Sequence, residues 1–167
     1  MITIYFALPL LAIIALLQAT VMPHLVLWGI FPNLSLVFVS SWGLLRGSGE
    51  GVIWGFIAGA TLDLFSGAPF GTSTLALISV GALSGQAQKS PLHAHVTLPL
   101  VTVFVASVLY GFVFLLLRQI GGQTVLWWDT LVRVILPTAA LNAVLTPLVF
   151  QLLRWVYNRY ISQETEW

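Results

Sequence analysis

A glycine returns at every fourth position through one stretch of the first half of the chain, and this spacing limits the possible folds more than any other feature. The residues in phase are Gly43, Gly47, Gly51, Gly55, Gly59, Asp63, Gly67 and Gly71. If residues 51–63 form one helix, positions four apart lie close together on one face. In water each helix glycine costs about 1 kcal/mol relative to alanine, whereas in lipid small residues let two helix backbones approach closely. The stripe is therefore predicted to be a helix-packing or partner-binding groove.

The composition predicts an integral membrane protein. Of the 167 residues, 59% are hydrophobic and only 7% are charged, and the mean hydropathy is +0.99. Soluble domains carry about a quarter charged residues. The net charge of +1 and the lack of a Lys or Arg run argue against a nucleic-acid partner. The chain has no cysteine, which excludes disulfides and thiolate metal sites.

Apolar runs divide the chain into about six transmembrane helices within one all-α domain. The predicted spans are residues 3–21, 33–46, 50–65, 70–88, 96–118 and 130–157. The first run lacks the basic residues of a cleaved signal, so it is interpreted as a membrane helix. A polar turn over residues 46–50 joins the second and third helices into a tight hairpin. Asn33 is expected to cap the second helix, and Glu50 suits the positive N-terminus of the third.

The cations predict the orientation of the chain. One side of the predicted topology carries Arg46, Lys89, Arg154 and Arg159, and the other carries Arg118 and Arg133. Because cytoplasmic loops of membrane proteins carry an excess of Lys and Arg, both termini are predicted to lie in the cytoplasm.

Asp63 closes the glycine stripe and is the only acid well inside a predicted span. A charged group in lipid is costly and normally has a partner. In one interpretation Asp63 is a helix-end residue that caps the following turn, residues 66–69. In the other it holds the fold or a partner, and Arg133, which lies inside the last span at a similar predicted depth, would form a buried pair with it.

The last predicted span contains Pro137, Asn142 and Pro147. Each proline removes one helix hydrogen bond, so this helix is expected to be kinked. Asn142 could satisfy a carbonyl that a proline leaves free, or it could reach a neighbouring helix.

The common catalytic motifs are missing from the sequence. It has no phosphate-binding Gly-x-x-x-x-Gly-Lys, no His-Glu-x-x-His and no Gly-x-Ser-x-Gly. Asp63 has no second carboxylate within a span for intramembrane catalysis. His93 and His95 make only half of a tetrahedral metal site, without a Cys or acid nearby. The chain is therefore predicted to have no catalytic residues, no metal and no cofactor. A proton or ion carrier would be expected to show a chain of buried polar groups.

Several of these segments together resemble the MreD family, the bacterial rod shape-determining membrane proteins. They are Pro32-Asn33-Leu34, the glycine series from Gly43 to Asp63-Leu64-x-Ser66-Gly67, and the C-terminal segments Leu136-Pro137, Leu141-Asn142-Ala143 and Pro147-Leu148-Val149-Phe150. Asn33 stands where many members have an acid.

The resemblance implies a multi-pass inner-membrane protein that is not an enzyme. It would be a scaffold or regulator of the cell-elongation complex that controls cell shape and lateral peptidoglycan synthesis. The implied partners are MreC, RodA with its penicillin-binding transpeptidase, the MreB filament, and membrane lipid. The fold would be similar to that of the substrate-binding subunits of energy-coupling-factor transporters. That similarity gives an alternative function, a small-molecule or lipid-binding subunit of such a transporter.

Overall fold

The computed structural model describes residues 31–65, 69–89 and 97–160. Every regular element in these ranges is a helix, which confirms the all-α prediction for this part of the chain. The elements are α2 (Leu34–Arg46), α3 (Ser48–Phe65), α4 (Thr72–Ala87), α5 (Thr97–Ile120), α6 (Trp127–Thr130), the π-helical segment η3 (Leu131–Ile135) and α7 (Leu136–Tyr160). The predicted first span, residues 3–21, lies outside the described residues, as do Gly67 and all three histidines.

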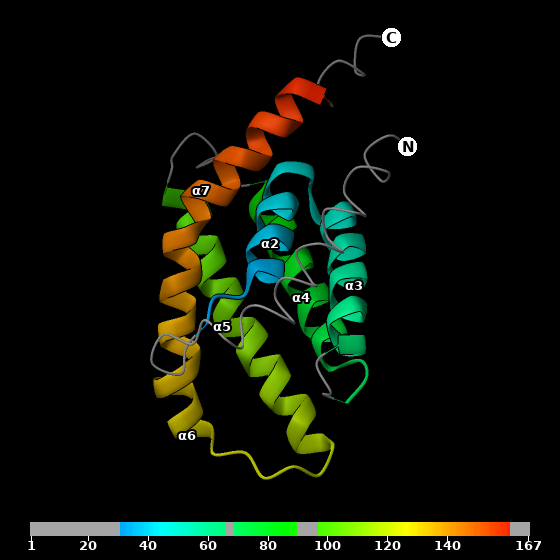
Figure 1. Ribbon diagram of the computed structural model, residues 1–167, viewed down its shortest axis with the longest axis vertical. Coiled ribbons are helices and arrows are strands. Elements are labelled where there is room, and N and C mark those ends of the chain that lie inside the picture. Colours follow the sequence, from blue (N-terminus) through cyan, green and yellow to red (C-terminus); the bar gives the residue numbers. More distant parts are fainter. Residues whose placement is uncertain (1–30, 66–68, 90–96, 161–167) are drawn as a thin grey trace.

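The short helix α2 occupies the centre of the bundle, with α3 on one side of it and α7 on the other (Figure 1). Residues 35–44 of α2 are all buried. A helix that is buried all round has no polar face to turn toward solvent. Its aromatic residues anchor the core: Phe38 stacks on Trp42 with ring centroids 5.9 Å apart, and Trp42 meets Trp54 of α3 edge-on at 6.1 Å.

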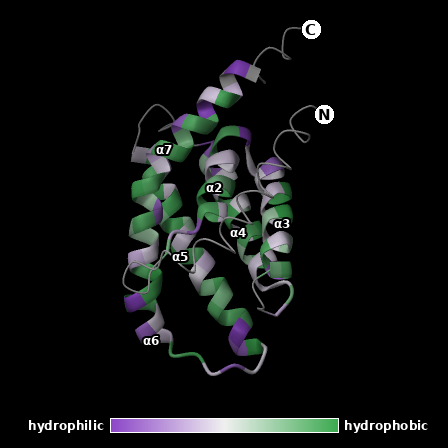
Figure 2. Ribbon diagram, in the orientation of Figure 1, coloured by the Kyte–Doolittle hydropathy of each residue, from purple (hydrophilic) through white to green (hydrophobic). Residues whose placement is uncertain are grey.

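The helices differ in length in a way that bears on membrane crossing. The stretches Thr97–Ile120 and Trp127–Tyr157 are long and apolar enough to cross a membrane. By contrast, α2, α3 and α4 have 13, 18 and 16 residues. At 1.5 Å per residue they are about 20–27 Å long, less than the roughly 30 Å hydrocarbon core. In Figure 2 the apolar colour runs along α5 and α7, and hydrophilic residues gather toward the helix ends. The count of six spans stays a prediction.

Helices α3 and α4 pack backbone against backbone along the glycine stripe. A Cβ atom added at Gly51 would lie 2.5 Å from the Gly81 carbonyl oxygen, and one at Gly55 would clash with the Leu77 carbonyl. At Gly59 it would clash with the backbone of Thr74. Only glycine permits this approach, because the obstacles are backbone atoms that cannot turn aside.

The last long helix changes its winding just before Pro137. Residues Leu131–Ile135 are π-helical, and the Leu136 N–H donates to the Leu131 carbonyl five residues earlier. Pro137 has no N–H to continue the α-helical ladder, so a π-turn at this point has an identifiable cause. The side chain of Ile135 then packs against Gly111 of α5, where an added Cβ would lie 2.7 Å from it.

We predict that Gly55→Ala lowers the free energy of unfolding by about 1–3 kcal/mol, the usual cost of overpacking. The matched control is Gly49→Ala in the first turn of the same helix, where an added Cβ meets nothing within 4 Å. Thermal unfolding of both variants in mild detergent measures the difference. Equal stability of the two variants would contradict the backbone contact between α3 and α4.

Candidate functional site

Asn142 lies at a junction of three helices inside the protein. It is fully buried on α7, and its Oδ1 accepts a hydrogen bond from the Asn33 backbone N–H at 2.8 Å. Its Nδ2 donates to the Ser107 hydroxyl of α5 at 3.0 Å. Of the two roles considered for Asn142, the structure shows the contact with neighbouring helices. The side chain joins α7 to α5 and to the start of α2.

Asn33 completes the N-terminus of α2. Its Oδ1 accepts from the Leu36 N–H at 3.0 Å, so the expected cap is confirmed. Asn33 is itself buried, with 8% of its surface exposed. The first N–H groups of a helix have no partner within the helix, and away from water a side chain must supply one. Asn33 and Asn142 together supply two acceptors at this buried helix end.

Asp63, at the end of α3, caps the N-terminus of the next helix. Its carboxylate accepts from the backbone N–H groups of Gly71, Ser73 and Thr74 at 2.9, 2.9 and 3.0 Å. The Thr74 hydroxyl donates to it as well, at 2.6 Å. The N-cap residue of α4 is Gly71, which has no side chain for this purpose. Asp63 takes that place from the preceding helix, and its negative charge suits the positive end of the α4 dipole.

This arrangement corrects the expected pair between Asp63 and Arg133. Arg133 instead lies beside Asp129, four residues earlier, with Nε 3.6 Å from Oδ1. Its side chain is 80% exposed, whereas Asp63 is 5% exposed. Asp63 therefore has the capping role. It caps residues 71–74 at the start of α4, which lie just beyond the turn at residues 66–69 that Asp63 was expected to cap.

The Tyr110 side chain links the two capped helix ends. It belongs to α5 and packs against the core, within hydrogen-bonding reach of the side chains of Asn33 and Ser73. A continuous set of polar groups thus extends from Asp63 to Asn142 and touches α2, α3, α4, α5 and α7. We call this set the polar junction: Asn33, Asp63, Ser73, Thr74, Ser107, Tyr110 and Asn142. A proton or ion carrier would be expected to contain such a chain of buried polar groups. Here, however, the Asp63 carboxylate is already bonded to the N–H groups at the start of α4.

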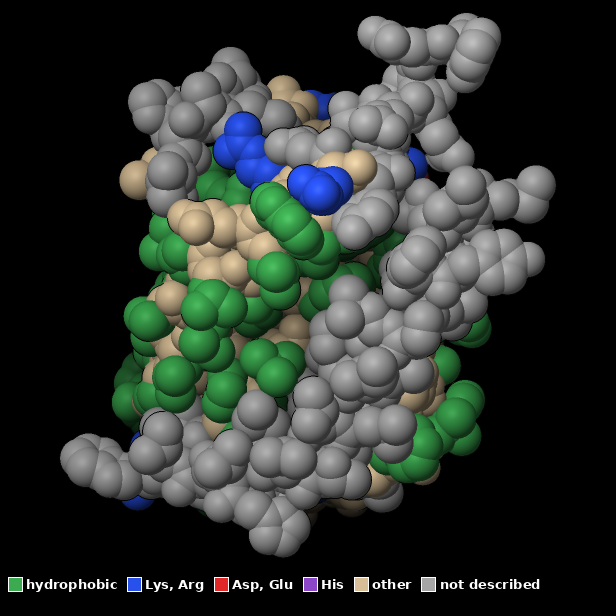
Figure 3. All heavy atoms as spheres, turned by 45° about the horizontal axis from the view of Figure 1, so that its top comes forward, with side chains coloured by type: hydrophobic (Ala, Val, Ile, Leu, Met, Phe, Trp, Pro, Cys, Tyr) green, Lys and Arg blue, Asp and Glu red, His purple; other side chains and the backbone are tan. Residues whose placement is uncertain are grey.

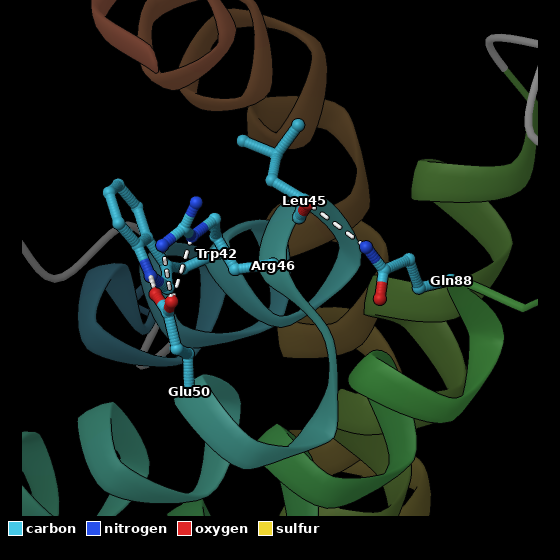
Figure 4. A network of polar contacts seen from close by, with 5 residues as sticks. All are labelled: Trp42, Leu45, Arg46, Glu50 and Gln88. Carbon is cyan, nitrogen blue, oxygen red and sulfur yellow. Dashed lines mark hydrogen bonds and ion pairs between the residues drawn. The ribbon is translucent and has the colours of Figure 1, made fainter. Parts of the chain in front are cut away.

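A second polar cluster closes the hairpin of α2 and α3 (Figure 4). Glu50 accepts from the Trp42 indole N–H at 3.0 Å and from Arg46 Nε at 2.8 Å. The Arg46 guanidinium also lies over the Tyr157 ring of α7, 5.5 Å from its centroid. On the far side of the turn, the side chain of Gln88, the C-cap residue of α4, donates to the Leu45 carbonyl at 3.1 Å. These contacts bring the C-terminal parts of α2, α4 and α7 to one end of the molecule.

That end is rich in cations. Figure 3, in which the top of Figure 1 comes forward, shows Lys and Arg side chains gathered there above a hydrophobic wall. The helix ends that meet there carry Arg46, Lys89, Arg154 and Arg159. Arg46 is occupied by Glu50, whereas the other three side chains are exposed. The four cations that the topology assigned to one side thus lie on helix ends that the structure brings together.

Several of these partners were not anticipated from the sequence. Ser107, Tyr110 and Tyr157 gave no signal, because they belong to long apolar helices and act through contacts between helices. Trp42 and Arg46 are four residues apart and share one face of α2, which the sequence could have indicated. Glu50 lies beyond the turn, in α3, so helix spacing does not predict its contacts with them. In the described part of the chain, no three His, Cys, Asp or Glu residues lie close enough to hold a metal ion.

The chain was compared with protein-family models, curated proteins and solved structures. A family model described as rod shape-determining protein MreD matches residues 1–156. The comparisons with curated proteins and with solved structures found no match.

We predict that Asp63→Ala destabilises the protein by about 3 kcal/mol or more, because it leaves three backbone N–H groups at the α4 N-terminus without an acceptor. The matched control is Asp129→Ala, which removes an exposed ion pair and should cost at most about 1 kcal/mol. Thermal unfolding in detergent compares the two. If both variants melt like the wild type, the cap does not hold α3 and α4 together.

We predict that Asn142→Leu, which keeps a similar volume, costs about 1–3 kcal/mol, because the buried Asn33 N–H loses its acceptor. Thr146→Val is the control one turn along the same face. The Thr146 hydroxyl donates only to the Asn142 carbonyl of its own helix, at 2.8 Å. Its loss should cost about 1 kcal/mol or less. Unfolding midpoints that fall equally in both variants would refute the junction at Asn142.

Proposed function

Because the chain belongs to the family of rod shape-determining protein MreD, we propose that it is a membrane scaffold of the bacterial cell-elongation complex. Family membership gives it a role in rod shape determination. In more detail, we propose that the protein lies in the inner membrane and has no catalytic activity. It would bind MreC, and also RodA together with its penicillin-binding transpeptidase. MreB would be its partner on the cytoplasmic side. The protein would thereby regulate lateral peptidoglycan synthesis.

The observation that carries this proposal is the small share of described chain outside helices. Within residues 31–65, 69–89 and 97–160, only residues 31–33, 47, 69–71, 88–89 and 121–126 lie outside helices. This part of the chain therefore offers a partner mainly helix faces and short connectors. The outward face of α5 is apolar and carries large exposed side chains, including Val101, Phe104, Phe112 and Leu116. Such a face suits partners that are themselves membrane proteins.

The cation-rich end supports the proposed orientation. The positive-inside rule assigns the end with the larger excess of Lys and Arg to the cytoplasm. At the opposite end, Arg133 is paired with Asp129, and Arg118 is bonded to the Gln123 side chain. The end formed by the α2–α3 turn and the C-terminal part of α7 would then face the cytoplasm. The connector between α5 and α6 would lie on the periplasmic side.

A depletion experiment in the host tests the scaffold. We expect cells without the protein to widen and lose their rod shape, and a plasmid copy of the wild type to restore it. Gly49→Ala should restore shape equally, whereas Gly55→Leu, which blocks the contact between α3 and α4, should not. Unchanged cell width after depletion, in a host without a second copy, would refute the proposal.

Purification in mild detergent separates the scaffold from the transporter alternative. A scaffold should copurify with MreC and the synthase pair. A transporter subunit should copurify with a bound small molecule and an energising ATPase module. Recovery of the second set without the first would replace the proposed function.

A further inference from the structure

One face of α7 is a continuous apolar strip that ends in a cation. Its members are spaced by four, four, three and four residues, the spacing of one helix face. They are Val144, Leu148, Leu152, Trp155 and Arg159. The four apolar side chains are 74%, 69%, 58% and 57% exposed, and Arg159 is exposed too. The rest of the described structure leaves this strip uncovered.

Along α7 the side chains of the strip change from aliphatic to aromatic to cationic. A bilayer changes in the same order, from hydrocarbon through the interface to charged headgroups. Arg159 lies in the last turn of α7, beyond the apolar members of the strip. Its guanidinium sits over the Trp155 ring, 5.9 Å from the centroid. Tryptophan favours the boundary between hydrocarbon and headgroups, and arginine pairs readily with phosphate.

The strip does not have the composition of a contact between membrane helices. Such contacts are enriched in small residues that let backbones approach, as α3 and α4 show with Gly51, Gly55 and Gly81. The strip carries only Val, Leu, Trp and Arg. Its bulky side chains suit the mobile hydrocarbon of an acyl chain.

The positive charge at the end of the strip complements an anionic ligand. Within the described residues, the two ion pairs are Arg46 with Glu50 and Arg133 with Asp129, so neither of these carboxylates serves Arg159. The exposed Arg154 adds a second positive charge close by. Cations at the membrane surface attract anionic lipids with about 1 kcal/mol each.

We propose that the strip binds an anionic phospholipid. Arg159 contacts the headgroup phosphate, Trp155 lies at the level of the glycerol backbone, and one acyl chain follows Leu152, Leu148 and Val144. This inference rests on the membrane location in the proposed function and on nothing else in it.

The test counts lipids that stay bound to the full-length protein. Protein purified in mild detergent is incubated with phosphatidylglycerol or phosphatidylcholine of the same acyl chains and examined by native mass spectrometry. The wild type should retain more phosphatidylglycerol. Arg159→Gln should lower its retention about fivefold, the effect of one surface cation, and leave phosphatidylcholine unchanged. Arg133→Gln, an exposed cation at the other end, should behave like the wild type.

Two results would overturn the proposal. One is equal retention of phosphatidylglycerol by the wild type and Arg159→Gln, and the other is no preference between the two lipids in the wild type. If Arg159→Gln instead loses a copurifying protein while its lipids stay unchanged, the strip binds protein and the lipid site does not exist. Rescue of cell shape by the same variant is scored separately, so failure here leaves the scaffold proposal standing.

Discussion

Two helices of this protein begin inside it, and the N–H groups at those helix starts must find acceptors away from water. Each unpaired N–H in such surroundings costs free energy comparable to a lost hydrogen bond. The start of α2 uses the side chains of Asn33 and Asn142, and the start of α4 uses Asp63. In both cases a side chain from another helix supplies an acceptor. The same hydrogen bonds therefore cap the helix and join it to its neighbour. The start of the short central helix is thus tied to α7, which supplies an acceptor to it.

The glycine contact and the Asp63 cap depend on each other. Asp63 is in phase with Gly51, Gly55 and Gly59, so it faces α4 as they do. Close approach of the two backbones brings the carboxylate within 3.0 Å of the N–H groups of α4. The cap in turn fixes α4 along its axis, so that Gly81 meets Gly51. An ionised side chain is tolerable at this depth because three N–H dipoles and a hydroxyl surround it.

The sequence predicted which residues share one helix face, the glycine groove among them, but not which side chains meet across helices. The Asn33 cap and the shared phase of the stripe follow from local pattern. The Arg133 partner was wrong because depth in a membrane does not fix the direction of a side chain around its helix axis. Asp129 was also available one turn away. The true partners of Asp63 are mostly backbone N–H groups, which a search for opposite charges does not count.

Helix α7 is fixed to the central helix at two levels, and this decides which surfaces are left for recognition. Asn142 binds the start of α2, and Tyr157 lies under Arg46 at its end. Tyr157 comes 15 residues after Asn142, and Arg46 comes 13 residues after Asn33, so the two helices run alongside each other for the length of α2. With one face of α7 held in this way, its opposite face is presented outward in a fixed rotation. The glycine faces of α3 and α4 are occupied by each other, whereas α5 and α7 present large exposed apolar side chains to a lipid or a partner helix.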